Sequence, residues 1–393
     1  MMTRYAICLI VLGSILACRP IVNYTTYKMV LAPIGSAPTQ DQAELFHDLF
    51  CAVMKSQSSS WGDCNKYLEP ARDALNLAAT DLDLSRFPLP SDKYEILIVP
   101  GMFASCVSDV STLEDAAKSL HDSYGLVVKI LGPDDNFSSF SSSEANEVII
   151  QNVIEQEYRV HHLPFILVGH SKGATDAMVF LADSDQAKGD AQTKVAALVS
   201  LAGVIGGSRF VDVIKNNKLN LLSVVTELIR SLGRCEPGYV PTDLAGLESL
   251  SRSVRLAFLQ SLIDRHQHFR SRMYSVVAIS DETTTSTQLR GSWDELAVYE
   301  RDQDGLMIRY DAILPGATYL GAALADHLTI AMPIQDSKHW WLRERMDRNN
   351  YPRSILLEAI IRFVIHDLSK EHQKGRVEAC AMLVCSSAIL SNR

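Results

Sequence analysis

The chain has 393 residues, enough for one large domain with an extension or for two domains. Apolar residues make up 47% and charged residues 21%, which is ordinary for a globular protein with a sizeable core. The formal net charge of −9 argues against a protein that binds nucleic acid through its phosphates, since such proteins carry a basic face.

The first 18 residues have the pattern of an export signal. Arg4 and the α-amine supply positive charge, and residues 5–17 form an apolar run too short to span a bilayer. The run ends in ILAC, which resembles the lipobox of bacterial lipoproteins and implies Cys18 as the lipidated residue. A plain signal peptide and an uncleaved anchor are the alternatives. The pattern predicts an exported protein, anchored in the bacterial cell envelope or secreted.

Six cysteines follow this segment, and an even count in an exported chain permits disulfides. They are Cys51, Cys64, Cys106, Cys235, Cys380 and Cys385. Short separations favour Cys51 with Cys64 and Cys380 with Cys385, but the connectivity stays open. The sequence contains no CxxC pair and no Cys/His cluster with zinc-site spacing, so it predicts no structural metal.

Residues 19–93 are predicted to form a tether and a helical N-terminal extension. Residues 19–40 are irregular and contain three prolines. Residues 41–55 place apolar side chains at helical spacing, and residues 69–82 form a second helical pattern with Pro70 near its start.

Strand and helix patterns alternate from residue 94 onward. The continuous apolar runs typical of buried parallel strands are 94–101, 126–131, 165–169, 194–203, 273–280 and 317–325. One intervening helix has Ser111 as a possible cap, Glu114 three residues later and Gly125 at its end. This alternation predicts an α/β fold with a mostly parallel sheet flanked by helices.

The alternation is interrupted over residues 209–272, which contain amphipathic helical patterns and no convincing strand. We interpret this range as a helical cap or lid over a pocket; an insertion with no special role is the plainer interpretation. Residues 354–368 form the closing helix, and 371–393 are a tail. The predicted core is therefore 94–208 and 273–370.

The segment FILVGHSKG (165–173) ends a predicted strand and opens a predicted helix. That is the setting of the G-x-S-x-G elbow, in which a sharp turn lifts a nucleophilic serine above the sheet. Ser171 is the candidate nucleophile. Gly169 and Gly173 are expected where the strand and the helix come too close for side chains. The helix that begins at Lys172 points its positive end at the site.

A nucleophilic serine needs a base and an orienting acid, which follow it in the order acid, then histidine, on this kind of fold. His327 lies just past the last predicted strand and is the candidate base. Two aspartates compete for the acid. Asp281 directly follows a strand but could cap a Thr-rich turn, and Asp304 is followed by Gly305, which lets the chain turn sharply.

Several segments resemble bacterial triacylglycerol lipases and related α/β-hydrolases. The stretch DGLMIRYDAILPG followed by ADHLT is similar to their acid and histidine loops, which implies Asp304 as the acid and His327 as the base. The stretch IVPGMF is similar to their oxyanion strand. It implies the backbone N–H groups of Met102 and Lys172 as oxyanion donors. The resemblance covers roughly residues 94–368 and leaves 209–272 unmatched.

The resemblance implies an α/β-hydrolase fold and a serine hydrolase that cleaves carboxylic esters, lipid-like ones in particular. The N-terminal pattern adds the expectation of export, and the interruption over residues 209–272 adds that of a helical cap. It implies no cofactor, and the expected partner is a small-molecule or lipid ester. Amide hydrolysis and acyl transfer would use the same residues, and a non-catalytic envelope lipoprotein could keep the fold as a binding module. For the Lys172 side chain, a charge that favours anionic substrates and a solvated lysine both stay open.

Overall fold

The computed structural model of the chain describes residues 40–57, 61–70, 82–102, 104, 109–182, 190–216, 245–265 and 269–370. The predicted export signal with Cys18, most of the helix predicted over 69–82, and the tail 371–393 lie outside the described residues. Among the described residues, no helix combines the length and the apolar content needed to cross a bilayer.

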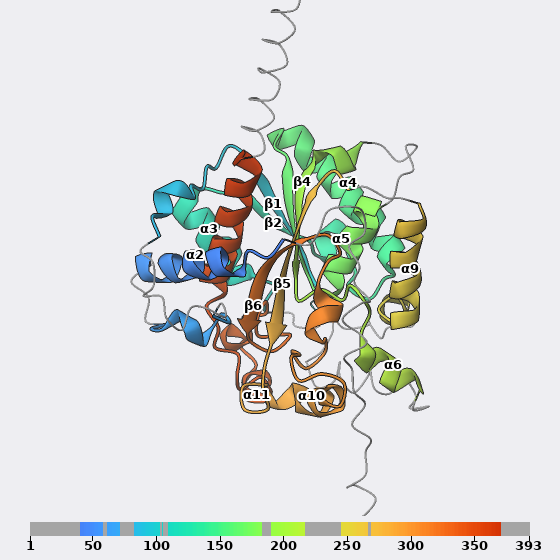
Figure 1. Cartoon of the computed structure of the whole chain (residues 1–393). Coiled ribbons are helices and arrows are strands. Elements are labelled where there is room, and N and C mark those ends of the chain that lie inside the picture. Colours follow the sequence, from blue (N-terminus) through green and yellow to red (C-terminus); the bar gives the residue numbers. More distant parts are fainter. Residues whose placement is uncertain are drawn as a thin grey trace, which may run out of the picture.

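In the part of the chain that the structure describes, six parallel strands form one sheet in the order β2-β1-β3-β4-β5-β6 (Figure 1). The strands are β1 (Glu95–Val99), β2 (Val128–Ile130), β3 (Phe165–His170), β4 (Val195–Leu201), β5 (Arg272–Ile279) and β6 (Thr318–Leu324). Each coincides with one of the predicted apolar runs. The strand order reverses direction between β1 and β3, and ligands of open parallel sheets bind at the carboxyl ends of strands beside such a point.

Helices cover both faces of the sheet, which explains why the strands are apolar without alternation. The α-helices in the described part of the chain are α2 (Ala43–Ser56), α3 (Glu114–Tyr124), α4 (Ser143–His161), α5 (Lys172–Ala182), α6 (Arg209–Asn216), α8 (Ala245–Glu248), α9 (Arg252–Asp264), α10 (Arg290–Ala297), α11 (Trp340–Arg345) and a closing helix over residues 353–370. Short 3₁₀ helices include Cys64–Lys66, Leu84–Arg86, Pro133–Asp135, Ala191–Lys194, Thr287–Leu289, Arg309–Ala312 and Ile334–Asp336.

The two faces of the sheet bury separate apolar clusters, because successive strand residues point to opposite sides. Ile96 and Ile98 of β1 pack with α2, α3 and the closing helix, whereas Leu97 and Val99 pack with α4, α5 and α9. Figure 1 shows these two groups of helices on opposite sides of the sheet.

The N-terminal region closes the open edge of the sheet at β6. We call residues 40–42 and 67–69 the N-terminal strap. The Gln42 N–H donates to the Tyr319 carbonyl at 2.8 Å, and the Glu69 N–H donates to the Ala322 carbonyl at 2.8 Å. A disulfide joins Cys51 of α2 to Cys64. The described part of the predicted extension is therefore integrated with the core. It covers backbone groups of β6 that an uncovered edge strand would expose without partners.

The range predicted as a cap is described only in part. Residues 217–244 lie outside the described residues, so a lid over the pocket stays a prediction. Within the range, α9 buries Leu259 and Leu262 in the same apolar cluster as α4 and α5. This helix therefore belongs to the layer that covers the sheet.

The predicted cap at Ser111 is wrong, whereas the predicted stop at Gly125 is confirmed. Helix α3 begins three residues after Ser111 and follows Leu113, which has a positive φ of 57°. The Leu113 N–H donates to the Ala331 carbonyl at 2.7 Å. Glu114 nevertheless reaches back to the predicted cap residue, because its carboxylate accepts the Ser111 N–H at 2.9 Å. Gly125 ends the helix with φ 66°.

Candidate active site

Ser171 occupies a strained turn between β3 and α5. Its φ is 54°, a left-handed conformation that is costly for a residue with a Cβ and that clusters at functional sites. A Cβ on Gly169 would lie 2.4 Å from the Ala174 Cα, and one on Gly173 would lie 2.0 Å from the Val99 carbonyl oxygen. Both glycines are required because the helix crosses the strands too closely for any side chain.

Ser171, His327 and Asp304 are brought together at the carboxyl end of the sheet. His327 Nε2 lies 2.7 Å from Ser171 Oγ, and His327 Nδ1 lies 2.7 Å from Asp304 Oδ2. All three side chains are buried. The His327 N–H also donates to the Asp304 carbonyl at 2.8 Å, so the two loops are fixed to each other through their backbones as well.

Asp304 is held by its own loop. Its Oδ1 accepts the backbone N–H groups of Leu306 at 2.9 Å and Met307 at 2.7 Å, which leaves Oδ2 for the histidine. Gly305 has φ 95° and makes the sharp turn possible. The competing Asp281 is exposed and accepts bonds from Thr283 and Thr284 instead. The sequence signal that distinguished these aspartates was the adjacent glycine.

The two predicted oxyanion donors both border Ser171. A Cβ on Gly101 would lie 2.8 Å from the Ser171 Cβ, so the backbone of the next residue, Met102, passes beside the nucleophile. Lys172 is the first residue of α5. The first N–H groups of a helix have no acceptor within the helix, which leaves this one free to bind an anion.

Neither interpretation of the Lys172 side chain is correct. The side chain is fully buried, and its Nζ lies 2.8 and 2.7 Å from the two carboxylate oxygens of Asp176, one turn later on α5. The Asn146 side-chain amide donates to the same carboxylate at 2.7 Å. The charge of Lys172 is therefore neutralised within the fold and does not meet the substrate or the solvent.

His170 is a residue of the site that the sequence reasoning missed. Its Nε2 lies 2.9 Å from the His327 carbonyl oxygen, and its ring lies 5.3 Å from the His327 ring. Burial, with the neighbouring His327, lowers the pKa of His170 to about 3. The imidazole is therefore neutral and donates its proton from Nε2 to that carbonyl. The serine turn and the histidine loop are tied together by this bond.

Asp326 is a second missed residue, and it shapes the histidine loop from within. It is fully buried, and its carboxylate accepts the N–H groups of Leu328 at 3.2 Å, Thr329 at 2.8 Å and Ser286 at 2.9 Å. Burial raises the pKa of Asp326. The Asp-x-x-Thr spacing of a side-chain-capped turn was the available signal.

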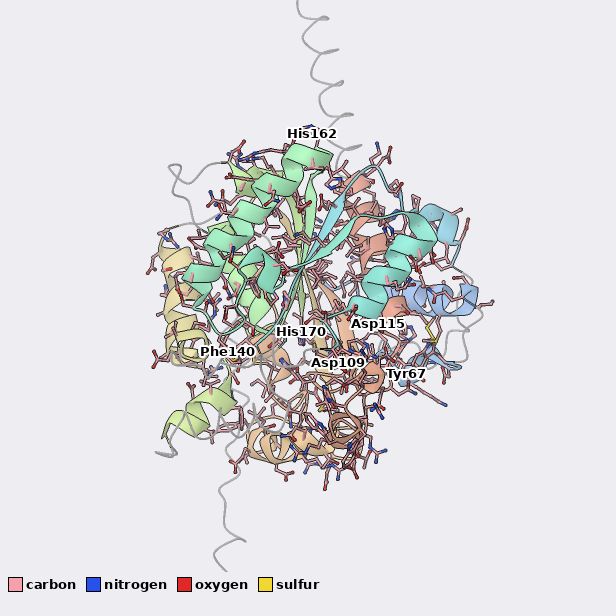
Figure 2. All side chains as sticks on the ribbon, turned by 180° about the vertical axis from the view of Figure 1, so that it is seen from behind. Tyr67, Asp109, Asp115, Phe140, His162 and His170 are labelled. Carbon is pink, nitrogen blue, oxygen red and sulfur yellow. A yellow bond between two sulfur atoms is a disulfide. The ribbon has the colours of Figure 1, made fainter. Side chains whose placement is uncertain are left out.

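Apolar side chains surround the catalytic end of the sheet. The Val204 N–H donates to the Ser171 carbonyl at 3.2 Å, and Val204 belongs to an apolar cluster that also contains Met102, Phe140 and Met307. Figure 2 shows Phe140 and His170 at the same end of the molecule. A substrate carbonyl at Ser171 would therefore have hydrocarbon neighbours.

Two groups of side chains in the described part of the chain have spacing that could hold a metal ion. One contains His47 and the cysteines of the Cys51–Cys64 disulfide, which cannot act as thiolate ligands. The other contains Glu95, Glu157 and His161. Neither group includes a residue of the triad.

No protein-family model matches the chain, and no curated protein matches it. The solved structure of the metagenomic carboxyl esterase MGS0156 matches with 30% identity over 89% of this chain and 100% of that chain, with a TM-score of 0.67. The mature lipase BlEst2 of Bacillus licheniformis matches with 18% identity over 61% and 86%, and a TM-score of 0.46. Lipase 1 from Pelosinus fermentans matches with 11% identity over 70% and 98%, and a TM-score of 0.43.

Proposed function

Because the chain belongs to the α/β-hydrolase superfamily, we propose that it is an exported serine hydrolase that cleaves carboxylic esters. The observation that carries the proposal is the unbroken pair of 2.7 Å contacts from Ser171 through His327 to Asp304. The matching carboxyl esterase supports the reaction type. No part of the proposed mechanism requires a cofactor.

The geometry suits a two-step acyl transfer. The Ser171 Oγ attacks the ester carbonyl while His327 Nε2 takes its proton, and Asp304 orients and stabilises the imidazolium. The backbone N–H groups of Met102 and Lys172 bind the oxyanion. The histidine then protonates the leaving alcohol. Water, deprotonated by the same histidine, hydrolyses the acyl-enzyme and restores the serine.

We propose lipid-like esters as the substrate class. The apolar cluster that includes Met102, Phe140 and Val204 lies beside the nucleophile and offers hydrocarbon contacts to an acyl chain. Each buried methylene contributes about 0.8 kcal/mol, or up to about fourfold in kcat/KM. Nitrophenyl esters of increasing acyl length should therefore be cleaved with rising kcat/KM. A flat or falling series would contradict the lipid-like substrate.

We propose export on two supports, the N-terminal sequence pattern and the Cys51–Cys64 disulfide. Disulfides persist in oxidising compartments and are rare in the cytosol. Fractionation of cells that express the full chain should find the protein in the membrane fraction, and Cys18→Ser should release it. A protein that keeps Met1 in its mature form would contradict cleavage of the signal.

Replacement of the nucleophile tests the enzymatic proposal. Ser171→Ala should lower kcat for nitrophenyl ester hydrolysis by roughly a million-fold and should abolish labelling by a fluorophosphonate probe. Ser200→Ala is the matched control, since Ser200 is also buried and pairs with Gly169 in the neighbouring strand. The control should keep its activity and its label. A Ser171→Ala protein with near wild-type turnover would show that the nucleophile is another residue.

A further inference from the structure

A cluster of ligand-type side chains lies at the end of the sheet opposite the triad. Glu95 is the first residue of β1, and Glu157 and His161 lie in the last turns of α4. The α4 helix ends three residues before β3, and Phe165 at the start of β3 pairs with Glu95. This short connection places the end of α4 over the start of β1. Figure 2 shows His162, the residue after His161, far from His170.

Glu95 is buried without a partner. Its side chain is 0% exposed, and neither carboxylate oxygen has a hydrogen-bond partner among the described residues. A buried carboxyl group in this state is costly, and native structures rarely keep one without a reason. Burial and the charge of Glu157 raise the pKa of Glu95 to about 7.

Glu157 and His161 are one helical turn apart, so they face the same side of α4. His161 Nε2 lies 3.6 Å from Glu157 Oε2. Lys129 approaches the other carboxylate oxygen of Glu157, Oε1, at 3.3 Å. One potential ligand atom from each of Glu95, Glu157 and His161 lies within 4.8 Å of the other two. The unpartnered carboxylate of Glu95 therefore points at the other two groups.

We propose that Glu95, Glu157 and His161 bind a zinc ion, with solvent in the remaining coordination position. Two carboxylates and an imidazole are a donor set that Zn²⁺ accepts, with ligand distances of about 2.0–2.2 Å. Tetrahedral ligands at that distance lie about 3.4 Å apart, close to the observed separation of Glu157 and His161. The Glu95 carboxylate lies within 4.8 Å of both groups. The His161 side chain is 33% exposed, so solvent reaches this side of the cluster.

The ion would connect α4 to β1 and replace the missing partner of Glu95. It would therefore stabilise the fold, since a ligand that binds only the folded state raises the unfolding temperature. The site shares no residue with the triad, so the proposal is independent of the proposed ester hydrolysis. The search for Cys/His spacing in the sequence missed it because two of its ligands are carboxylates far apart in the chain.

Zinc titration of the full-length protein tests the proposal. The protein is stripped with a chelator under non-reducing conditions, and calorimetry with ZnCl₂ should give one tight site per chain and a rise in the melting temperature. Glu95→Gln and His161→Ala should each weaken this binding by roughly tenfold or more and remove the rise. Glu95→Gln keeps the shape of the side chain, so it should fold as the wild type does.

His339→Ala is the control, because it removes an exposed histidine outside the cluster. It should bind zinc as the wild type does. Two results would overturn the proposal: a stripped wild-type protein that binds no zinc, or variants at Glu95 and His161 that bind it with unchanged affinity and stoichiometry. The first would mean that Glu95 holds a proton in place of a metal, and the second that other side chains bind the ion.

Discussion

The two ends of the sheet differ in whether their buried ionisable side chains have hydrogen-bond partners. At the carboxyl end, Asp304 and Asp326 are buried and their carboxylates accept several hydrogen bonds, and Lys172 is paired within its own helix. At the amino end, Glu95 is buried as deeply and has no hydrogen-bond partner among the described residues.

The difference separates two reasons for burying a polar group. The carboxyl end buries groups whose partners fix their position, as a reaction that depends on orientation requires. The amino end buries a carboxyl group that has no hydrogen-bond partner among the described residues, which is the group that we propose as a zinc ligand. Substitutions at the two ends should therefore change activity and the free energy of unfolding by different amounts, and the change in the free energy of unfolding should differ in sign.

Among the variants that compare the two ends, the largest effect is expected at the acid of the triad. Asp304→Asn keeps the shape but lets His327 adopt the wrong tautomer, and should lower kcat by roughly ten-thousand-fold. Asp281→Asn, at an exposed aspartate that caps a turn, should change kcat little. Steady-state ester hydrolysis by the two purified variants makes the comparison. The reverse result would move the acid to Asp281.

The next effect is on stability, at the ion pair beneath the nucleophile. Lys172→Met leaves the Asp176 charge buried without its cation and should lower the free energy of unfolding by about 3–5 kcal/mol. Lys118→Met is the matched control, because Lys118 and Asp122 form an exposed pair with the same spacing on α3. That change should stay within about 0.5 kcal/mol. Equal losses in denaturant unfolding would contradict the role assigned to burial.

The third effect is a pH dependence from His170. Its pKa is about 3 in the folded state, below the ordinary value of 6.5, so only the unfolded chain takes up this proton at pH 4–6. The contribution of the neutral His170 to the free energy of unfolding is fully present above pH 6.5. It is lost as the pH falls toward 3, with a slope of up to about 1.4 kcal/mol per pH unit.

The variant His170→Gln should reduce this slope by up to about 1.4 kcal/mol per pH unit, which is the contribution of one proton. The measurement is the free energy of unfolding at several pH values from 6 to 4, for the variant and the wild type. The slope is informative even if the variant is less stable at every pH. Parallel curves would show that His170 is not the group that titrates.

The smallest effect has the opposite sign. In chelator-treated protein, Glu95→Met removes an unpartnered buried carboxyl and should raise the free energy of unfolding by about 1–2 kcal/mol. Asp92→Met, at an exposed position just before β1, should leave it nearly unchanged. Destabilisation by Glu95→Met without metal would mean that the carboxyl has a stabilising partner of its own.

The sequence could predict the six strands because each is an apolar run bounded by turns, and this signal is local. The elbow was predictable for the same reason, since a strand, two glycines and a helix start are contiguous around Ser171. The contacts of the Lys172 side chain could not be predicted in this way. A lysine and an aspartate four residues apart usually form a surface pair, and only the packing on both sides of α5 buries this one.

The sequence reasoning also could not find the meeting of Glu95 with the end of α4. These groups are more than sixty residues apart along the chain, and nothing in either segment indicates the other. The same applies to Ser111. Leu113 is the N-cap residue of α3 in place of Ser111, and its N–H bonds to Ala331, more than two hundred residues later.

The N-terminal strap has a consequence for how the chain matures. It pairs with β6, the last strand along the described part of the chain, so the edge of the sheet cannot close until β6 has left the ribosome. Pairing between distant segments is slow. During that interval the bare edge of β6 invites aggregation, and a chaperone that shields it would raise the yield of soluble protein.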